Sequence, residues 1–301
     1  MKNNEKPSYL KFAFAWLVYG FIWLIAQLPY RLLRSMGVGL GKLLQVTLKS
    51  RAKVVKTNLS ICFPQLTDLQ RKELQNLHYK ELGQMFTQTI QAFLCNTRKM
   101  EQDTIIHGAE NIERCLANNQ GVLLITAHFT SLELGGKMLC KRYPIAGMYR
   151  PHKHPLTEYI VRKSRLTYAC KMFKREQLRP IVKHLKNGGI LWYAPDQNYR
   201  RGQSVFAPFF GRPASTITAT HQLARLSGCK IIFFHIKRND QAPYYTLTIS
   251  KPLADFPSKD PIRDTSRINE GIEAMIKKNP QEYLWMHKRF KNTANGEKSP
   301  Y

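Results

Sequence analysis

The 301-residue chain lacks the motifs of several large enzyme classes. It contains no G-x-S-x-G element for a serine nucleophile, no phosphate-binding loop and no G-x-G-x-x-G turn for a dinucleotide. Its six cysteines are widely spaced and form no C-x-x-C pair, so neither a zinc site nor a disulfide framework is predicted. Covalent serine chemistry and nucleotide binding are therefore disfavoured, and packed thiols in a reducing compartment are expected.

Acidic residues are also scarce. The chain has 47 lysines and arginines against 20 aspartates and glutamates, a formal net charge of +27. The excess is concentrated in residues 1–56, with ten basic residues against one acidic residue, and in residues 137–186, with fourteen against two. A field of this size favours nucleic acid, an anionic membrane surface or another acidic partner.

The first basic zone contains an apolar segment. Residues 12–28 carry no charge and are almost wholly apolar, with aromatic side chains at Trp16, Tyr19 and Trp23. As a helix this segment is about 26 Å long, the lower limit for crossing a bilayer. The sequence Gln27-Leu-Pro-Tyr-Arg31 that follows does not resemble a signal-peptide cleavage site.

We therefore expect residues 1–30 to form a membrane anchor. More cations follow the apolar segment than precede it, which places the large domain in the cytoplasm if the helix makes a single pass through a membrane. A helix lying in the membrane interface, held by flanking cations, is the alternative.

Residues 31–295 alternate between helical and strand patterns, which predicts one α/β domain with a central mixed sheet flanked by helices. Residues 296–301 are expected to form a frayed tail. The expected helices cover residues 37–60, 68–94, 110–118, 131–141, 177–187 and 214–227, and a last one that begins at Asp260-Pro261. The expected strands cover residues 104–107, 121–127, 145–149, 190–194, 230–237 and 244–250.

The segment from His128 to Glu133 joins a buried strand to a helix, where α/β proteins place their chemistry. A histidine can act there as a general base, and a carboxylate can orient it. The alternative is a capping box formed by Thr130 and Glu133. Residues five apart on a helix point about 140° away from each other. His128 and Glu133 can therefore meet only if His128 precedes the helix.

Two further segments hold candidate residues. The stretch 150–165 contains Arg150, His152, His154 and Arg165, and its uncompensated charge favours an anionic ligand over a solvated helix face. A metal site is disfavoured because the two histidines have no third ligand nearby.

In the second segment, the strand 190–194 runs into a loop that contains Asp196. The alternative for this loop is a turn in which Pro195 and Asp196 shape the local backbone.

Seven motifs occur in an order that resembles the lipid A late acyltransferases, the lauroyl/myristoyl family of Gram-negative inner membranes. They are Asn58-Leu-x-x-Cys-Phe-Pro64, His128-x4-Glu133, Tyr149-Arg-Pro151, Arg165, Trp192-Tyr-Ala-Pro-Asp196, Ser204-Val-Phe-x-Pro208 and Tyr283-Leu-Trp-x-His-x-Arg-Phe290. The resemblance covers nearly the whole chain and implies the α/β fold of the glycerolipid-type acyltransferases.

The resemblance implies transfer of a fatty acyl group from acyl carrier protein to a hydroxyl of a lipid A precursor that bears Kdo sugars. His128 and Glu133 would form the catalytic pair, and Arg165, Asp196 and Arg150 would bind or support the substrates. Acyl carrier protein, the anionic lipid and the membrane are the implied partners. The resemblance implies no nucleic acid partner and no metal. It implies no cofactor either, since the acylated carrier protein is a co-substrate.

In this interpretation His128 takes the proton of the acceptor hydroxyl as that hydroxyl attacks the thioester, and Glu133 stabilises the imidazolium. Arg165 would contact a phosphate or a Kdo carboxylate. Two alternatives stay open from the sequence. One is a basic, membrane-anchored lipid-binding protein without catalysis, and the other is a lipid hydrolase that uses the same His/Glu pair.

Overall fold

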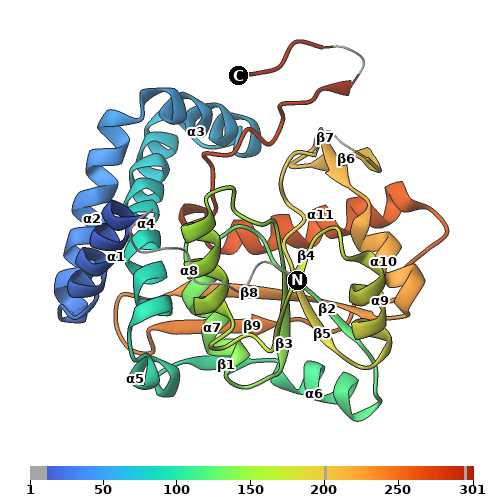
Figure 1. The fold of residues 1–301 in the computed structure, drawn as a ribbon. Coiled ribbons are helices and arrows are strands. Elements are labelled where there is room, and N and C mark those ends of the chain that lie inside the picture. The colour runs from blue at the N-terminus through green and yellow to red at the C-terminus, as the bar shows by residue number, and fades with distance from the viewer. Residues whose placement is uncertain (1–11, 200–201, 295–296) are drawn as a thin grey trace.

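The computed structural model describes residues 12–199, 202–294 and 297–301. In these residues a seven-stranded sheet runs through the molecule in the order β1-β9-β8-β2-β5-β3-β4 (Figure 1). Its strands are β1 (Ile105–His107), β2 (Val122–Ile125), β3 (Ile145–Tyr149), β4 (Lys171–Lys174), β5 (Ile190–Tyr193), β8 (Lys230–Arg238) and β9 (Tyr245–Ile249). All neighbours are parallel except β8 and β9, which confirms the predicted mixed sheet.

Two hydrophobic cores cover the two faces of the sheet. Along β2, Leu123 and Ile125 face one core while Val122 and Leu124 face the other, as the twofold alternation of a strand requires. The first core also packs α3 (Lys49–Cys62), α9 (Leu178–Lys186), α10 (Ala219–Ser227) and α11 (Pro261–Lys278). The second packs α6 (Ala109–Ala117) and α7 (Leu132–Cys140). Because β2 is buried on both sides, its end is a fixed platform for the residues that follow it.

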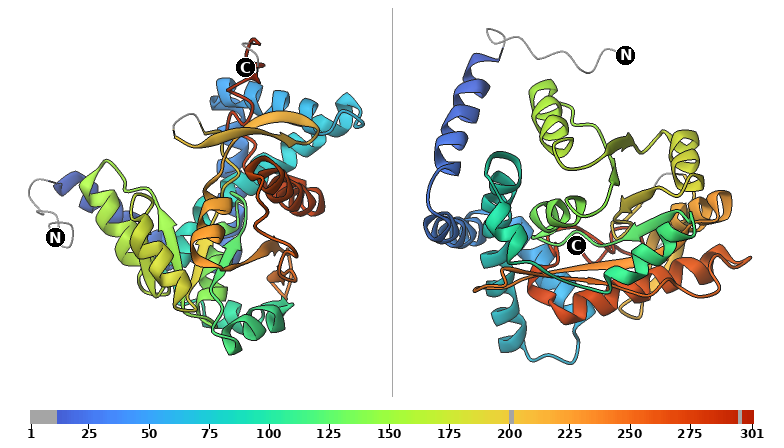
Figure 2. Two further views of the ribbon diagram at one scale, coloured as in Figure 1. Left: turned by 90° about the vertical axis from the view of Figure 1, so that its right-hand side faces the viewer. Right: turned by 90° about the horizontal axis from the view of Figure 1, so that it is seen from below.

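The N-terminal helices form a layer beside the sheet (Figures 1 and 2). They are α1 (Ala13–Ala26), α2 (Tyr30–Thr47), α3 and α4 (Asp68–Leu94), which begins with a capping box formed by Thr67 and Gln70. Helices α2 and α4 cross closely enough that a Cβ atom on Gly83 would lie 2.0 Å from the Gly37 carbonyl oxygen. A Cβ on Gly41 would lie 2.1 Å from the Tyr79 carbonyl oxygen, so this crossing requires glycine.

Within the described residues, no helix has both the length and the apolar character needed to cross a membrane. Helix α1 has 14 residues, which corresponds to about 21 Å. Part of the expected anchor, residues 1–11, lies outside the described residues.

The remaining elements show where the sequence predictions were wrong. The expected helix 37–60 is interrupted at Leu48, where α2 ends and α3 begins. The expected helix 214–227 is shorter, because residues 212–217 form strand β7 (Arg212–Ile217), paired antiparallel with β6 (Ser204–Phe209). The helix that follows, α10, ends at residue 227 as predicted, and the next residue, Gly228, has a positive φ of 72°.

Short helices complete the description: α5 (Arg98–Gln102), α8 (Pro155–Arg165) and the 3-10 turn η1 (Pro280–Glu282). Residue 296 of the expected frayed tail lies outside the described residues. The last residue, Tyr301, accepts a hydrogen bond from the Phe290 amide at 3.1 Å and donates one to Asn58. The tail thus ends against helix α3.

Candidate active site

The candidate site lies at the carboxyl ends of two neighbouring parallel strands, β2 and β5. Strands β2 and β5 pair with Ile125 opposite Tyr193, so their carboxyl ends meet at one edge of the sheet. His128 follows Ile125 by three residues, and Asp196 follows Tyr193 by three. Crevices at such edges are where open α/β sheets bind ligands.

A tight turn directs His128 away from the strand. The Phe129 amide donates to the Ala127 carbonyl at 2.8 Å, which closes a turn with His128 at its centre. Helix α7 begins only at Leu132, so His128 lies before the helix, as the sequence required for an active histidine.

His128 is held by Asp196. Its Nδ1 lies 2.6 Å from Asp196 Oδ1, and its backbone amide donates to Asp196 Oδ2 at 3.2 Å. The Asp196 side chain is 1% exposed and the imidazole is 32% exposed. Because Nδ1 faces the carboxylate, it carries the proton in the neutral ring, and Nε2 is the basic nitrogen.

The two groups shift each other's pKa. Burial lowers the pKa of His128, but the charge and hydrogen bond of Asp196 outweigh it and leave that pKa above its ordinary value. Burial raises the pKa of Asp196, whereas the charge and hydrogen bonds of His128 lower it to about 2. Asp196 is therefore ionised at neutral pH, and the imidazolium of His128 is stabilised by it.

Glu133 has a different partner from the one expected. Its carboxylate accepts two hydrogen bonds from Arg165, from Nε at 2.9 Å and from Nη2 at 2.7 Å. It also accepts a hydrogen bond from the Tyr168 hydroxyl. The expected support of His128 by Glu133 is therefore corrected, since the carboxylate bonded to the imidazole is Asp196. The reason is geometric, because Glu133 lies in the first turn of α7 and points toward α8.

The capping-box alternative is not formed either. The N-cap of α7 is Ser131, whose side chain makes no capping hydrogen bond, and the Thr130 hydroxyl is buried without a hydrogen-bond partner among the described residues. Glu133 is thus committed to Arg165, and burial within this cluster together with the Glu133 carboxylate raises the pKa of Tyr168.

His128, Glu133, Arg165 and Arg150 all line one cavity of about 700 Å³. Much of its wall is apolar: Leu132, Ile145, Met148, Ala169, Met172, Ile181, Trp192 and Leu223. The loop that presents Arg150 is fixed by Glu158, which accepts from the Tyr149 hydroxyl at 2.7 Å and from the His152 amide at 2.9 Å. A long apolar wall with arginines fits a ligand that has a hydrocarbon chain and an anionic group.

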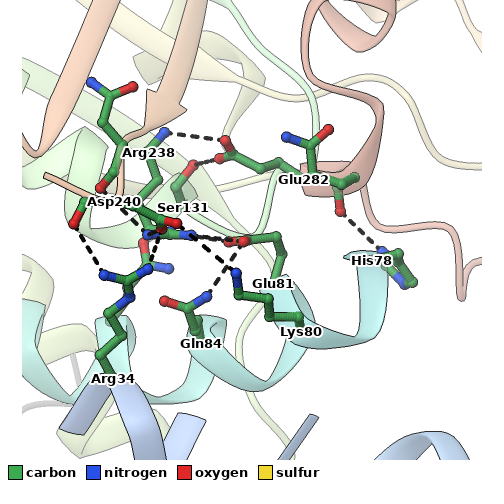
Figure 3. A network of polar contacts seen from close by, with 12 residues as sticks. Arg34, His78, Lys80, Glu81, Gln84, Ser131, Arg238, Asp240 and Glu282 are labelled. Carbon is green, nitrogen blue, oxygen red and sulfur yellow. Dashed lines mark hydrogen bonds and ion pairs between the residues drawn. The ribbon is translucent and has the colours of Figure 1, made fainter. Parts of the chain in front are cut away.

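The loop that carries His128 is supported from behind by residues 282–284. The Leu284 amide donates to the His128 carbonyl at 2.9 Å, and the Thr130 amide donates to the Glu282 carbonyl at 2.7 Å. The Ser131 hydroxyl donates to the Glu282 carboxylate at 2.7 Å (Figure 3). These bonds fix the backbone on both sides of the imidazole.

Glu282 connects this loop to a buried ionic network. Its carboxylate accepts from the Arg238 amide at 3.1 Å, and the Arg238 guanidinium is bonded to Glu81 at 2.7 and 3.0 Å (Figure 3). Burial and the negative charge of Glu81 raise the pKa of Glu282 to about 8. Glu282 therefore holds a proton at neutral pH.

The structure brings the five predicted residues together at one site. His128 is paired with Asp196, Glu133 is paired with Arg165, and Arg150 lines the same cavity as His128, Glu133 and Arg165. Sequence reasoning missed Tyr168, Glu282 and Ser131 as supporting residues. Tyr168 follows Arg165 by three residues, and Glu282 directly precedes the recognised motif that begins at Tyr283. Their closeness in the sequence to candidate residues and motifs is the feature by which Tyr168 and Glu282 could have been found.

Known proteins are similar to this chain over nearly its whole length. A family model described as "Bacterial lipid A biosynthesis acyltransferase" matches residues 1–292. The chain belongs to this family. It is 35% identical to the lipid A biosynthesis lauroyltransferase of Escherichia coli strain K12 over 95% of this chain and 94% of that protein. It is 34% identical to the lipid A biosynthesis palmitoleoyltransferase of the same strain over 100% of this chain and 98% of that protein.

Among solved structures, the chain is similar to the 1-acyl-sn-glycerophosphate acyltransferase PlsC of Thermotoga maritima. That likeness has a TM-score of 0.39 and 14% identity, and it covers 82% of this chain and 96% of that chain. As a member of the lipid A acyltransferase family, the protein is an acyltransferase enzyme.

Proposed function

We propose that this lipid A acyltransferase moves a fatty acyl chain from acyl carrier protein to a hydroxyl of a Kdo-bearing lipid A precursor at the inner membrane. The observation that supports the chemistry is the bond of 2.6 Å between His128 Nδ1 and the buried Asp196 carboxylate, beside the apolar cavity. This bond makes Nε2 the base and orients the ring toward the substrates.

In the reaction, His128 Nε2 accepts the proton of the acceptor hydroxyl while its oxygen attacks the thioester carbonyl carbon. The tetrahedral intermediate collapses, the carbon–sulfur bond breaks, and the imidazolium returns its proton to the leaving thiolate. An ester and a free thiol result, and no protein nucleophile is needed. Asp196 keeps its charge throughout and stabilises the imidazolium, as the orienting carboxylate does in hydrolytic triads.

Glu133 serves this reaction through Arg165. A guanidinium held by two parallel hydrogen bonds is fixed in orientation and remains cationic. Arg165 and Arg150 line the same cavity. We therefore propose that these two arginines bind the anionic groups of the acceptor, a phosphate or a Kdo carboxylate. Glu133 is then a positioning residue, and its loss would weaken acceptor binding.

The membrane side of the molecule is indicated by exposed apolar side chains. On α1 these include Phe14, Leu17 and Phe21, which are 79%, 73% and 64% exposed. On α2, Leu43 and Val46 are 58% and 69% exposed. Exposed apolar side chains on two consecutive helices, flanked in the sequence by lysines and arginines, fit a membrane with anionic lipid, and we propose that α1 and α2 attach the enzyme to it.

The proposal is tested with purified full-length protein, acyl carrier protein charged with a fatty acid, and a defined Kdo-bearing acceptor, with the products analysed by mass spectrometry. We expect the acceptor to gain the mass of one acyl group, and His128→Ala to abolish the gain. Free fatty acid without a heavier acceptor would show a hydrolase instead. Unchanged turnover in both His128→Ala and Glu133→Ala would contradict the proposed site.

A further inference from the structure

The cavity lies between two different surfaces. Helix α1 contacts α8, with ring centroids of Trp16 and Tyr159 6.4 Å apart, and α8 contributes Arg165 to the cavity wall. Helix α9 borders the same cavity through Leu178 and Ile181. Helices α1 and α9 lie on opposite sides of the molecule in Figure 1 and in the right-hand view of Figure 2. If α1 rests on a membrane, α9 remains in water.

The outward face of α9 is strongly basic. Arg179, Lys183 and Lys186 are spaced four and three residues apart, which places them on one face of the helix, and all three are exposed. We call these three residues the α9 basic face. Around it, residues 171–186 contain six lysines and arginines and a single carboxylate, Glu176, which is paired with Arg175 at 2.8 Å.

Intramolecular contacts do not explain this face. Among the described residues, no ion pair to a carboxylate is formed by any of the three cations. Lys183 and Lys186 stand in the last turn, where cations are favourable, but Arg179 stands in the first turn of a helix that has no acid there. Like charges four residues apart also repel. An acidic partner would relieve both effects.

We propose that the α9 basic face is the docking surface for the acidic carrier protein that delivers the acyl chain. This inference rests on the proposed function, since it assumes that the donor is protein-borne. The apolar helices occupy the membrane side, whereas α9 faces water and borders the cavity that holds His128. A carrier bound there can insert its acyl group past Leu178 and Ile181 toward His128.

The test uses the full chain with the triple variant Arg179→Glu, Lys183→Glu, Lys186→Glu. Two donors with the same fatty acid are compared, acyl carrier protein and acyl-pantetheine, a neutral thioester without the protein. We expect the ratio of kcat/KM for the carrier to that for acyl-pantetheine to fall roughly tenfold or more, the range that electrostatic steering contributes. The salt dependence of the carrier reaction should weaken as well.

A matched control places the same charge change elsewhere, with Lys72→Glu, Arg114→Glu and Arg263→Glu, exposed residues of α4, α6 and α11. Its donor ratio should equal that of the wild type. The milder triple Arg179→Gln, Lys183→Gln, Lys186→Gln should lower the ratio part of the way if the glutamate variant does not fold.

The possible results distinguish failure of the docking surface from failure of the proposed function. A donor ratio unchanged in both α9 triples, or lowered equally in the control triple, overturns the docking surface. Reduced binding to phosphatidylglycerol vesicles with an unchanged donor ratio would assign the face to lipid and also overturn it. A wild-type protein that transfers from neither donor would instead refute the proposed function.

Discussion

His128 and Asp196 each stand three residues beyond one paired position, Ile125 opposite Tyr193, on parallel neighbouring strands. Their contact therefore follows from strand adjacency, because parallel neighbours in register bring equal offsets to the same place. The Nδ1–Oδ1 distance of 2.6 Å is the consequence. A histidine at a strand end becomes a polarised base when a second strand end supplies a buried carboxylate.

Replacing Asp196 with asparagine tests this pair. The variant keeps an oxygen near Nδ1 but removes the negative charge, and kcat/KM should fall roughly 10²–10⁴-fold, as in other histidine bases that lose their orienting carboxylate. In the wild type, Asp196 raises the pKa of His128, so activity should decline as pH falls through a value above 6.5. The variant's decline should move to lower pH. An unshifted pH profile would contradict the assignment.

The substitution Glu133→Gln distinguishes the role of Glu133 from that of Asp196. Because Glu133 is bonded to Arg165 and Tyr168, the substitution should raise KM for the acceptor while the acid limb of the pH profile stays in place. Arg165→Lys should act in the same direction, since lysine cannot make the paired hydrogen bonds. If Glu133→Gln shifts the acid limb instead, Glu133 acts on His128 directly, as the sequence alone suggested.

Glu282 should make stability depend on pH. Its pKa in the folded protein is about 8, above the ordinary glutamate value, so the folded state holds a proton that the unfolded state releases. The free energy of unfolding should therefore decrease as pH rises through the interval up to about 8. Urea unfolding of wild type and Glu282→Gln across this interval provides the measurement.

In Glu282→Gln the amide is neutral at every pH and can still bond Ser131 and the Arg238 amide, so the decrease should disappear. Glu73→Gln, at an exposed position of α4, serves as the control and should follow the wild type. Equal slopes for wild type and Glu282→Gln would show that Glu282 is ionised in the folded protein.

The apolar side chains of α1 should determine membrane attachment. Phe14→Ser, Leu17→Ser and Phe21→Ser combined remove exposed apolar area at little expected cost to folding, because these side chains point outward. The variant should leave membranes in a high-salt wash that retains the wild type. Leu69→Ser with Ile262→Ser, also exposed but on α4 and α11, should remain bound. Retention of the α1 variant would place membrane binding on another surface.

Much of the fold was predictable because its signals are local. The apolar runs of β2, β5 and β8, the cap at Thr67 and the glycine at the end of α10 depend on a few neighbouring residues. The β6–β7 hairpin was not predicted. The helix predicted over residues 214–227 includes Thr216 and Ile217, which are β-branched and favour strand. The turn at Phe210-Gly211, where both residues have positive φ, joins the two strands.

The amino-acid sequence was enough to name His128, Glu133, Arg165 and Asp196 as candidate residues and to place His128 and Asp196 after predicted strands. The pairing of Asp196 with His128 and of Glu133 with Arg165 became visible only in the folded chain. The strand order inserts β5 between β2 and β3, so Asp196 reaches His128 while helix α7 directs Glu133 to Arg165. Strand adjacency depends on how the helices pack on both faces of the sheet, and no local pattern in the chain encodes it.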